Sequence, residues 1–185
     1  MDHAVQAYSR YLAGEDEALA EIIREYKDGL ILFLNRYVND LHEAEELAED
    51  TFFKLVIRRP RFKGGSSFKT WLFAIGRNAA VDHLRKVGKR AGLTELEVFR
   101  LSREEDELER TYFREERKVA VHRALSRLEP ERGRVLYLKY FEELDIGEIA
   151  RVLRKNKRQV SNLLYQAKKS LKTQLEREGI TDEGL

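Results

Sequence analysis

Apolar residues in the first half of the chain recur at spacings of three, four and seven. Between positions 16 and 38 they lie at Leu19, Ile22, Ile23, Tyr26, Leu30, Phe33, Leu34 and Tyr37. This spacing predicts one amphipathic helix, or two helices broken near Gly29. Asp40 can cap a following helix that Pro60 would end. The inner face of that helix would contain Leu41, Ala44, Leu47, Ala48, Thr51, Phe52, Leu55 and Val56. Another helix resumes near Phe68 and is predicted to end around 87–88.

The second half predicts a charged linker followed by further helices. Residues 90–116 are highly charged with weak periodicity, and apolar spacing resumes after Lys118. Glu129 and Pro130 predict a break, and two helices follow at 146–153 and from 157 to about 175. The sequence therefore predicts an all-α protein with two small helical domains, at 1–90 and 118–175. The charged linker would be 91–117, and 176–185 would form a C-terminal tail.

The last two predicted helices have the pattern of a helix-turn-helix. Their inner faces are apolar, and Ala150 is small where the helices would cross. Asn156 can cap the second helix, with Gln159 completing a capping box. Arg154 stands where such a turn usually has glycine, so either its backbone is unusual or the turn differs. The outer face carries Lys157, Arg158, Gln159, Ser161, Asn162, Tyr165, Gln166, Lys168 and Lys169. Such side chains suit phosphates and base edges, although a basic helix pair that only packs would have the same pattern.

The charges alternate along the chain although the net charge is only +2. Residues 58–90 hold ten Lys or Arg and one acidic residue. Residues 151–175 hold eight Lys or Arg and no acidic residue. The segments at 40–50 and 95–117 are acidic. Two basic segments between acidic ones favour two anion-binding faces over ordinary solvated helix surfaces, although each block alone fits either interpretation.

The segment at 62–78 interleaves aromatic rings with bases, glycines and small polar residues. Proteins hold single-stranded DNA in this way, because cations follow the backbone and rings stack on unpaired bases. The alternative is that the rings belong to the core, since Phe68 shares a helical face with Leu72 and Ile75. Trp71 and Phe73 fit either role.

Composition excludes several classes of function. The chain has no cysteine, and no apolar run approaches the roughly 20 residues of a membrane-spanning helix. The N-terminus lacks the order of a signal peptide, so a cytoplasmic protein is expected. His3, His42, His83 and His122 are scattered, and no phosphate-binding loop or nucleophile motif is present. We therefore expect no catalytic activity, no metal and no cofactor.

Three stretches resemble one family over nearly the whole chain. Residues 43–55, 68–85 and 144–171 are similar to regions 2.2, 2.3–2.4 and 4.2 of bacterial RNA polymerase sigma factors. The similarity is to the sigma-70 family and its extracytoplasmic-function (ECF) subgroup. The resemblance implies a factor that binds core RNA polymerase and directs promoter-specific transcription initiation. It also brings in promoter DNA and an anti-sigma factor as partners, with no membrane insertion.

The resemblance further implies roles for individual residues. Polymerase binding would fall to Glu46, Asp50, Thr51, Phe53 and Lys54. Melting and reading of the minus-ten element would fall to Lys63, Ser66, Phe68, Lys69, Trp71, Arg77, Asn78, Arg85 and Lys86. Recognition of the minus-thirty-five element would fall to Lys157, Arg158, Gln159, Ser161, Asn162, Tyr165, Lys168 and Lys169. Residues 159–163 depart from the usual core of that helix, so the promoter sequence it reads is not implied.

Two other interpretations explain less of the sequence. A helix-turn-helix repressor or activator that ignores polymerase would account for 118–175 but not for the first module. A structural adaptor should show no salt-dependent binding to DNA. For a sigma factor, we expect the free chain to bind promoter DNA poorly, with the acidic linker repelling DNA or lying across the basic faces.

Overall fold

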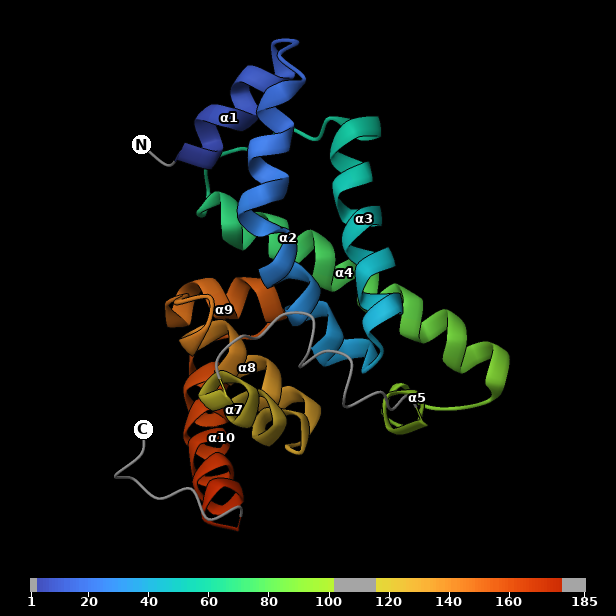
Figure 1. Ribbon diagram of the computed structural model, residues 1–185, viewed down its shortest axis with the longest axis vertical. Coiled ribbons are helices and arrows are strands. Elements are labelled where there is room, and N and C mark those ends of the chain that lie inside the picture. The colour runs from blue at the N-terminus through green and yellow to red at the C-terminus, as the bar shows by residue number, and fades with distance from the viewer. Residues whose placement is uncertain (1–2, 102–115, 178–185) are drawn as a thin grey trace.

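The computed structural model describes residues 3–101 and 116–177, and every regular element in these ranges is a helix. The first module contains α1 (His3–Leu12), α2 (Glu17–Val38), α3 (Leu41–Arg58), α4 (Phe68–Ala91) and α5 (Glu95–Leu101). The second contains α7 (Glu116–Ser126), α8 (Pro130–Tyr140), α9 (Ile146–Leu153) and α10 (Lys157–Arg177). The all-α prediction is confirmed. Figure 1 shows α1 to α4 in one half of the molecule and α7 to α10 in the other.

The long helix α2 organises the first module and contacts the second. It packs against α1, α3, α4 and α8. The alternative of a break near Gly29 is wrong, because α2 runs unbroken through that residue. A glycine inside a helix costs about 1 kcal/mol relative to alanine. Burial offsets this cost, since every residue from 30 to 38 is buried on all sides of the helix.

Local capping signals fix several helix ends. The side chain of Asp40 accepts a hydrogen bond from the amide of Glu43 at 3.0 Å, which confirms it as the N-cap of α3. Helix α8 begins at Pro130, at the predicted break. Helix α4 begins at Phe68 as predicted but continues to Ala91 rather than ending at 87–88. Its end is set by Gly92, whose left-handed φ of 69° suits a glycine.

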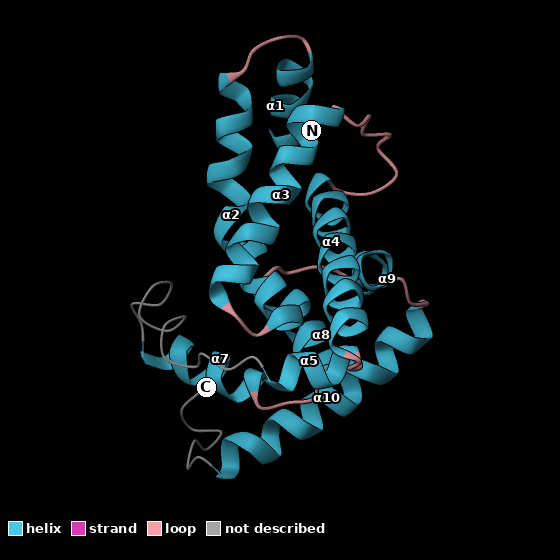
Figure 2. Cartoon of the chain, turned by 90° about the vertical axis from the view of Figure 1, so that its right-hand side faces the viewer, coloured by secondary structure: helices cyan, strands magenta, loops and turns pink. Residues whose placement is uncertain are grey.

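The two modules share one continuous apolar core. Helix α8 lies against α2 and helix α9 lies against α4, as both views show (Figures 1 and 2). The rings of Phe33 and Tyr137 stack across this boundary with centroids 6.4 Å apart. Helix α5 and the start of α7 fall inside the predicted linker, whose residues 102–115 lie outside the described ranges. Within the described residues, no helix combines the length and apolarity needed to cross a membrane.

Candidate nucleic-acid interface

The basic loop before α4 is anchored at both ends. The hydroxyl of Tyr8 donates to the carbonyl of Pro60 at 2.7 Å, which fixes the start of the loop to α1. At the other end, the side chain of Ser67 caps α4 by accepting from the amide of Thr70 at 3.2 Å. Between these anchors Gly64 turns the chain with a φ of +72°. Lys63 is exposed on this loop.

Four rings form a cluster beneath the loop. Phe68 lies 5.3 Å from Trp71 and 5.7 Å from Phe62, and Tyr8 lies 5.4 Å from Phe68. Phe68 is fully buried, whereas Trp71 and Phe62 are half-buried. Burial, reinforced by neighbouring Tyr11, raises the pKa of Tyr8 to about 12. In this conformation Phe68 supports the other rings and is not accessible to DNA, while Trp71 keeps part of its ring at the surface.

The structure resolves the two open interpretations for Phe73. It is fully buried and its ring lies 5.3 Å from Phe33, so Phe73 belongs to the core. The sequence carried no signal for this, because Trp71 and Phe73 both adjoin Leu72. Long-range packing was needed to distinguish it from Trp71.

The remaining predicted minus-ten residues lie farther along α4. Arg77 donates to the side-chain oxygen of Asn78 at 3.4 Å, and both are half-buried. Arg85 and Lys86 are exposed, and Arg85 pairs with Glu95 at 3.6 Å. A helix rises 1.5 Å per residue, so Arg85 lies about 24 Å from Lys69 along the axis. The structure thus separates a loop end, with Lys63, Ser66, Phe68, Lys69 and Trp71, from a basic helix face, with Arg77, Asn78, Arg85 and Lys86.

The helix-turn-helix forms as the sequence predicts. Asn156 and Gln159 exchange reciprocal hydrogen bonds of 2.8 Å, which confirms the capping box of α10. Arg154 has a left-handed φ of 53°, so the turn keeps the backbone that glycine usually provides. Val160, Leu164 and Ala167 are buried against the rest of the module. All the residues predicted to read minus-thirty-five DNA are exposed: Lys157, Arg158, Gln159, Ser161, Asn162, Tyr165, Lys168 and Lys169.

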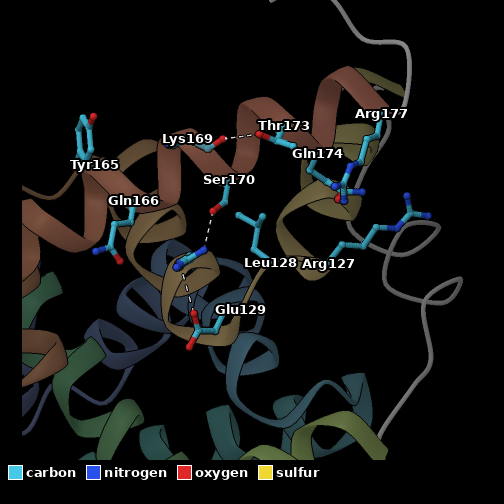
Figure 3. A pocket seen from close by; sticks show the side chains of 11 residues that line it. Arg127, Leu128, Glu129, Tyr165, Gln166, Lys169, Ser170, Thr173, Gln174 and Arg177 are labelled. Carbon is cyan, nitrogen blue, oxygen red and sulfur yellow. Dashed lines mark hydrogen bonds and ion pairs between the residues drawn. The ribbon is translucent and has the colours of Figure 1, made fainter.

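A basic groove borders this face of α10. It has a volume of about 560 Å³ and lies between α10 and the turn joining α7 to α8. Figure 3 shows Lys169 on one side of the groove and Arg127 and Glu129 on the other. Arg132 crosses it, donating to the hydroxyl of Ser170 at 2.7 Å and pairing with Glu129 at 3.4 Å. The groove extends the cationic surface of α10 beyond the residues that the sequence singled out.

The acidic helix α3 presents an exposed apolar stripe beside its carboxylates. Glu46 and Asp50 are exposed, and Phe53 is 61% exposed. Thr51 is fully buried, and its hydroxyl donates to the carbonyl of Leu47 in the same helix at 2.8 Å, so the prediction that Thr51 faces polymerase is wrong in this conformation. Lys54 is half-buried. Sequence reasoning missed Ile57, which is 66% exposed one turn after Phe53 and could have been found from that spacing.

Comparisons with known proteins match each of the two modules. Residues 22–90 match Sigma-70 region 2, and residues 118–171 match Sigma-70, region 4. The RNA polymerase sigma factor YlaC of Bacillus subtilis (strain 168) is 27% identical over 164 residues, covering 84% of this chain and 91% of that protein. The ECF RNA polymerase sigma factor SigW of the same organism is 26% identical over 170 residues, which cover 88% of this chain and 91% of that protein.

Two solved structures share the fold. The sigma factor RpoE, in complex with the anti-sigma factor NepR from Bartonella quintana, has a TM-score of 0.69 at 19% identity and covers 85% of this chain and 96% of that one. CnrH, in complex with the cytosolic domain of CnrY, has a TM-score of 0.62 at 19% identity, with coverage of 95% and 96%. Fold and surface together define a two-module, all-helical DNA-binding protein. Since the two regional matches cover both modules, the chain belongs to the sigma-70 family of RNA polymerase sigma factors and is of the ECF type.

Proposed function

We infer that this chain binds core RNA polymerase and directs it to promoters. The observation that carries this conclusion is the presence of Sigma-70 regions 2 and 4 on one chain. Region 2 brings recognition of the minus-ten element and region 4 recognition of the minus-thirty-five element. A repressor or activator that acts without polymerase would need only the second module. A factor that binds polymerase would act where polymerase acts, so we propose a cytoplasmic location. We also propose that the chain binds and positions DNA and does not itself catalyse a reaction.

At the minus-thirty-five element, α10 is proposed to enter the major groove. Its exposed Arg158, Gln159 and Asn162 lie in the first two turns, where side chains of a recognition helix reach base edges. Lys168 and Lys169 lie two turns farther along and suit backbone phosphates. Lys168 also lies over the ring of Tyr140, with its ammonium 5.6 Å from the centroid.

At the minus-ten element, the loop end of α4 is proposed to hold an opened strand. The part-exposed Trp71 offers a ring for stacking, and Lys63 and Lys69 supply cations for the strand's phosphates. Arg77, Asn78, Arg85 and Lys86 would follow the adjoining DNA along the helix. Polymerase would bind the face of α3 formed by Glu46, Asp50, Phe53 and Lys54, to which the structure adds Ile57. An anti-sigma factor, such as accompanies RpoE, is a further candidate partner.

Transcription in vitro tests this function directly. Purified chain is mixed with bacterial core polymerase and a library of genomic DNA fragments, and the RNA 5′ ends are sequenced. We expect start sites that appear only when the chain is present and that share two upstream sequence elements. A chain that neither associates with core polymerase nor produces any new start site would overturn the proposal.

A further inference from the structure

Carboxylates of the second module occupy the loop end of α4, where an opened DNA strand is proposed to bind. The contacts involve Glu142, in the turn after α8, and Glu148, in the first turn of α9. Neither residue was a candidate from the sequence, although Asp145 and Glu148 have the spacing of a capping box. The two glutamates come from a module about 70 residues farther along the chain, so only the tertiary fold brings them to α4.

Glu142 neutralises the cation proposed to hold the strand. A carboxylate oxygen of Glu142 lies 3.0 Å from the ammonium of Lys69, which also donates to the Glu142 carbonyl at 3.2 Å. The other carboxylate oxygen accepts a hydrogen bond of 2.9 Å from the hydroxyl of Tyr137. Glu142 is only 8% exposed. Because Glu142 is buried and the Lys69 side chain is 32% exposed, this partly buried pair is screened less by salt than a fully exposed pair would be.

Glu148 occupies the polar groups at the start of α4. One carboxylate oxygen accepts from the hydroxyl of Ser67 at 2.7 Å and from that of Thr70 at 3.0 Å. The other accepts from the amide of Asp145 at 3.0 Å, which completes the capping box of α9. Burial opposes ionisation of Glu148, but the hydrogen bonds from Ser67, Asp145 and Thr70 prevail, and its pKa lies below the usual range. The charged carboxylate of Glu148 therefore accepts hydrogen bonds at the start of α4, as the oxygens of a bound phosphate would.

A second set of contacts holds the modules in this position. The guanidinium of Arg36 donates to the ring nitrogen Nδ1 of His122 at 2.7 Å, and Arg134 donates to the carbonyl of Arg36 at 3.0 Å. The guanidinium of Arg134 lies 3.7 Å from the ring centroid of Tyr37. The hydroxyl of Tyr137, which donates to Glu142, also lies 3.1 Å from the carbonyl oxygen of Gly29, so its single proton is shared between the two acceptors. These contacts join α2 to α7 and α8, so the carboxylates meet α4 as part of a packed interface.

We propose that the chain inhibits itself: Glu142 and Glu148 act as phosphate mimics that block the minus-ten strand site until the modules separate. The proposal rests on the function inferred above, which assigns that site to DNA. The proposal concerns a defined surface of the second module; the expectation for the acidic linker falls largely on residues 102–115, which lie outside the described ranges. Because only the open form can bind the strand, the measured affinity is reduced by the fraction of molecules that are open.

The test compares the binding of single-stranded DNA by full-length variants. The probe is a fluorescein-labelled 20-nucleotide pool of random sequence at low salt, with binding followed by anisotropy. Glu142→Gln with Glu148→Gln removes both charges, while a glutamine at position 148 can still complete the capping box. We expect binding about tenfold tighter than that of the unmodified chain. Adding Lys69→Ala to this variant should abolish most of the gain, since the freed site depends on that cation.

Two further variants separate the mechanism from a general change in charge. Glu143→Gln with Glu176→Gln removes two exposed carboxylates of the same module and should leave affinity within about twofold. Gly29→Ala changes no charge, but its Cβ would lie 2.5 Å from a carboxylate oxygen of Glu142. It should displace that side chain and raise affinity several-fold, without weakening α2.

A conformational readout completes the experiment. The chain has no native cysteine, so Glu17→Cys and Lys172→Cys can carry a dye pair, one on each module. Saturating DNA should lower energy transfer, because binding and module separation are linked. If the paired glutamine variant bound no better than its control and DNA left energy transfer unchanged, self-inhibition would be refuted even if the chain directed transcription. Failure of the proposed sigma function would be seen in a different experiment: the chain would produce no new start sites in the transcription assay with core polymerase.

Discussion

Acidification is predicted to destabilise this protein through one buried histidine. His122 is 1% exposed and accepts a hydrogen bond from the Arg36 guanidinium, which can only donate. Its Nδ1 must therefore lack a proton, and the ring is neutral. Burial, with the nearby Arg36 charge, lowers the pKa of His122 to about 2. Arg36 itself stays charged at neutral pH, because burial lowers its pKa only to about 10.

The size of the effect follows from proton linkage. In the unfolded chain an imidazole has a pKa of about 6.5, so it binds a proton as the pH falls from about 7.5 to about 5. The folded chain binds none at His122 in this range. The unfolded state therefore gains protons on acidification, and the free energy of unfolding falls by about 2 kcal/mol over the interval. The stabilisation is present above pH 6.5 and is lost progressively below it.

Urea unfolding followed by circular dichroism at the two pH values measures this change. The matched control is His122→Asn, whose amide oxygen can accept from Arg36 but does not titrate. It is expected to be less stable at pH 7.5 but to lose about 2 kcal/mol less on acidification than the unmodified chain. His3, His42 and His83 are common to both proteins, so the difference isolates His122. Equal losses in the two proteins would refute the assignment of a neutral, buried imidazole.

Five other substitutions test the surfaces and the core. Trp71→Ala should impair strand opening, measured by permanganate reactivity, more than closed-complex binding; equal loss of both would contradict its role as a stacking ring. Arg158→Ala should cost about 1–3 kcal/mol at one promoter position and relax specificity there, whereas Lys169→Ala should weaken all sequences alike and lower the salt slope by about one, both read from holoenzyme binding curves. Phe53→Ala should weaken association with core polymerase at least several-fold in a pull-down titration while leaving the melting temperature unchanged; normal association would exclude α3 as the docking face. Phe73→Ala should lower the free energy of unfolding by about 3–5 kcal/mol, and a loss below 1 kcal/mol would contradict its place in the core.

Signals confined to a few neighbouring residues were sufficient to predict the starts of α3, α8 and α10, whereas α1 was not predicted and α4 ends later than expected. The cap at Asp40, the break at Pro130 and the reciprocal cap of Asn156 and Gln159 each depend on groups within three residues. Apolar spacing identified most of the helix faces, including the exposed side of α10, although Val56, predicted on the inner face of α3, is 39% exposed. The resemblance of three stretches to one family then predicted the function.

Only the tertiary structure determined which helices pack together and which of their side chains become buried or paired. Apolar spacing could not show that α2 runs unbroken through Gly29, because its second half is buried by α3, α4 and α8 together. Nor could it separate the buried Phe73 from the part-exposed Trp71. The pairing of Lys69 with Glu142 joins residues 73 positions apart. Local sequence records which side chains a helix turns outward, but only the packing of distant helices determines which of them meet.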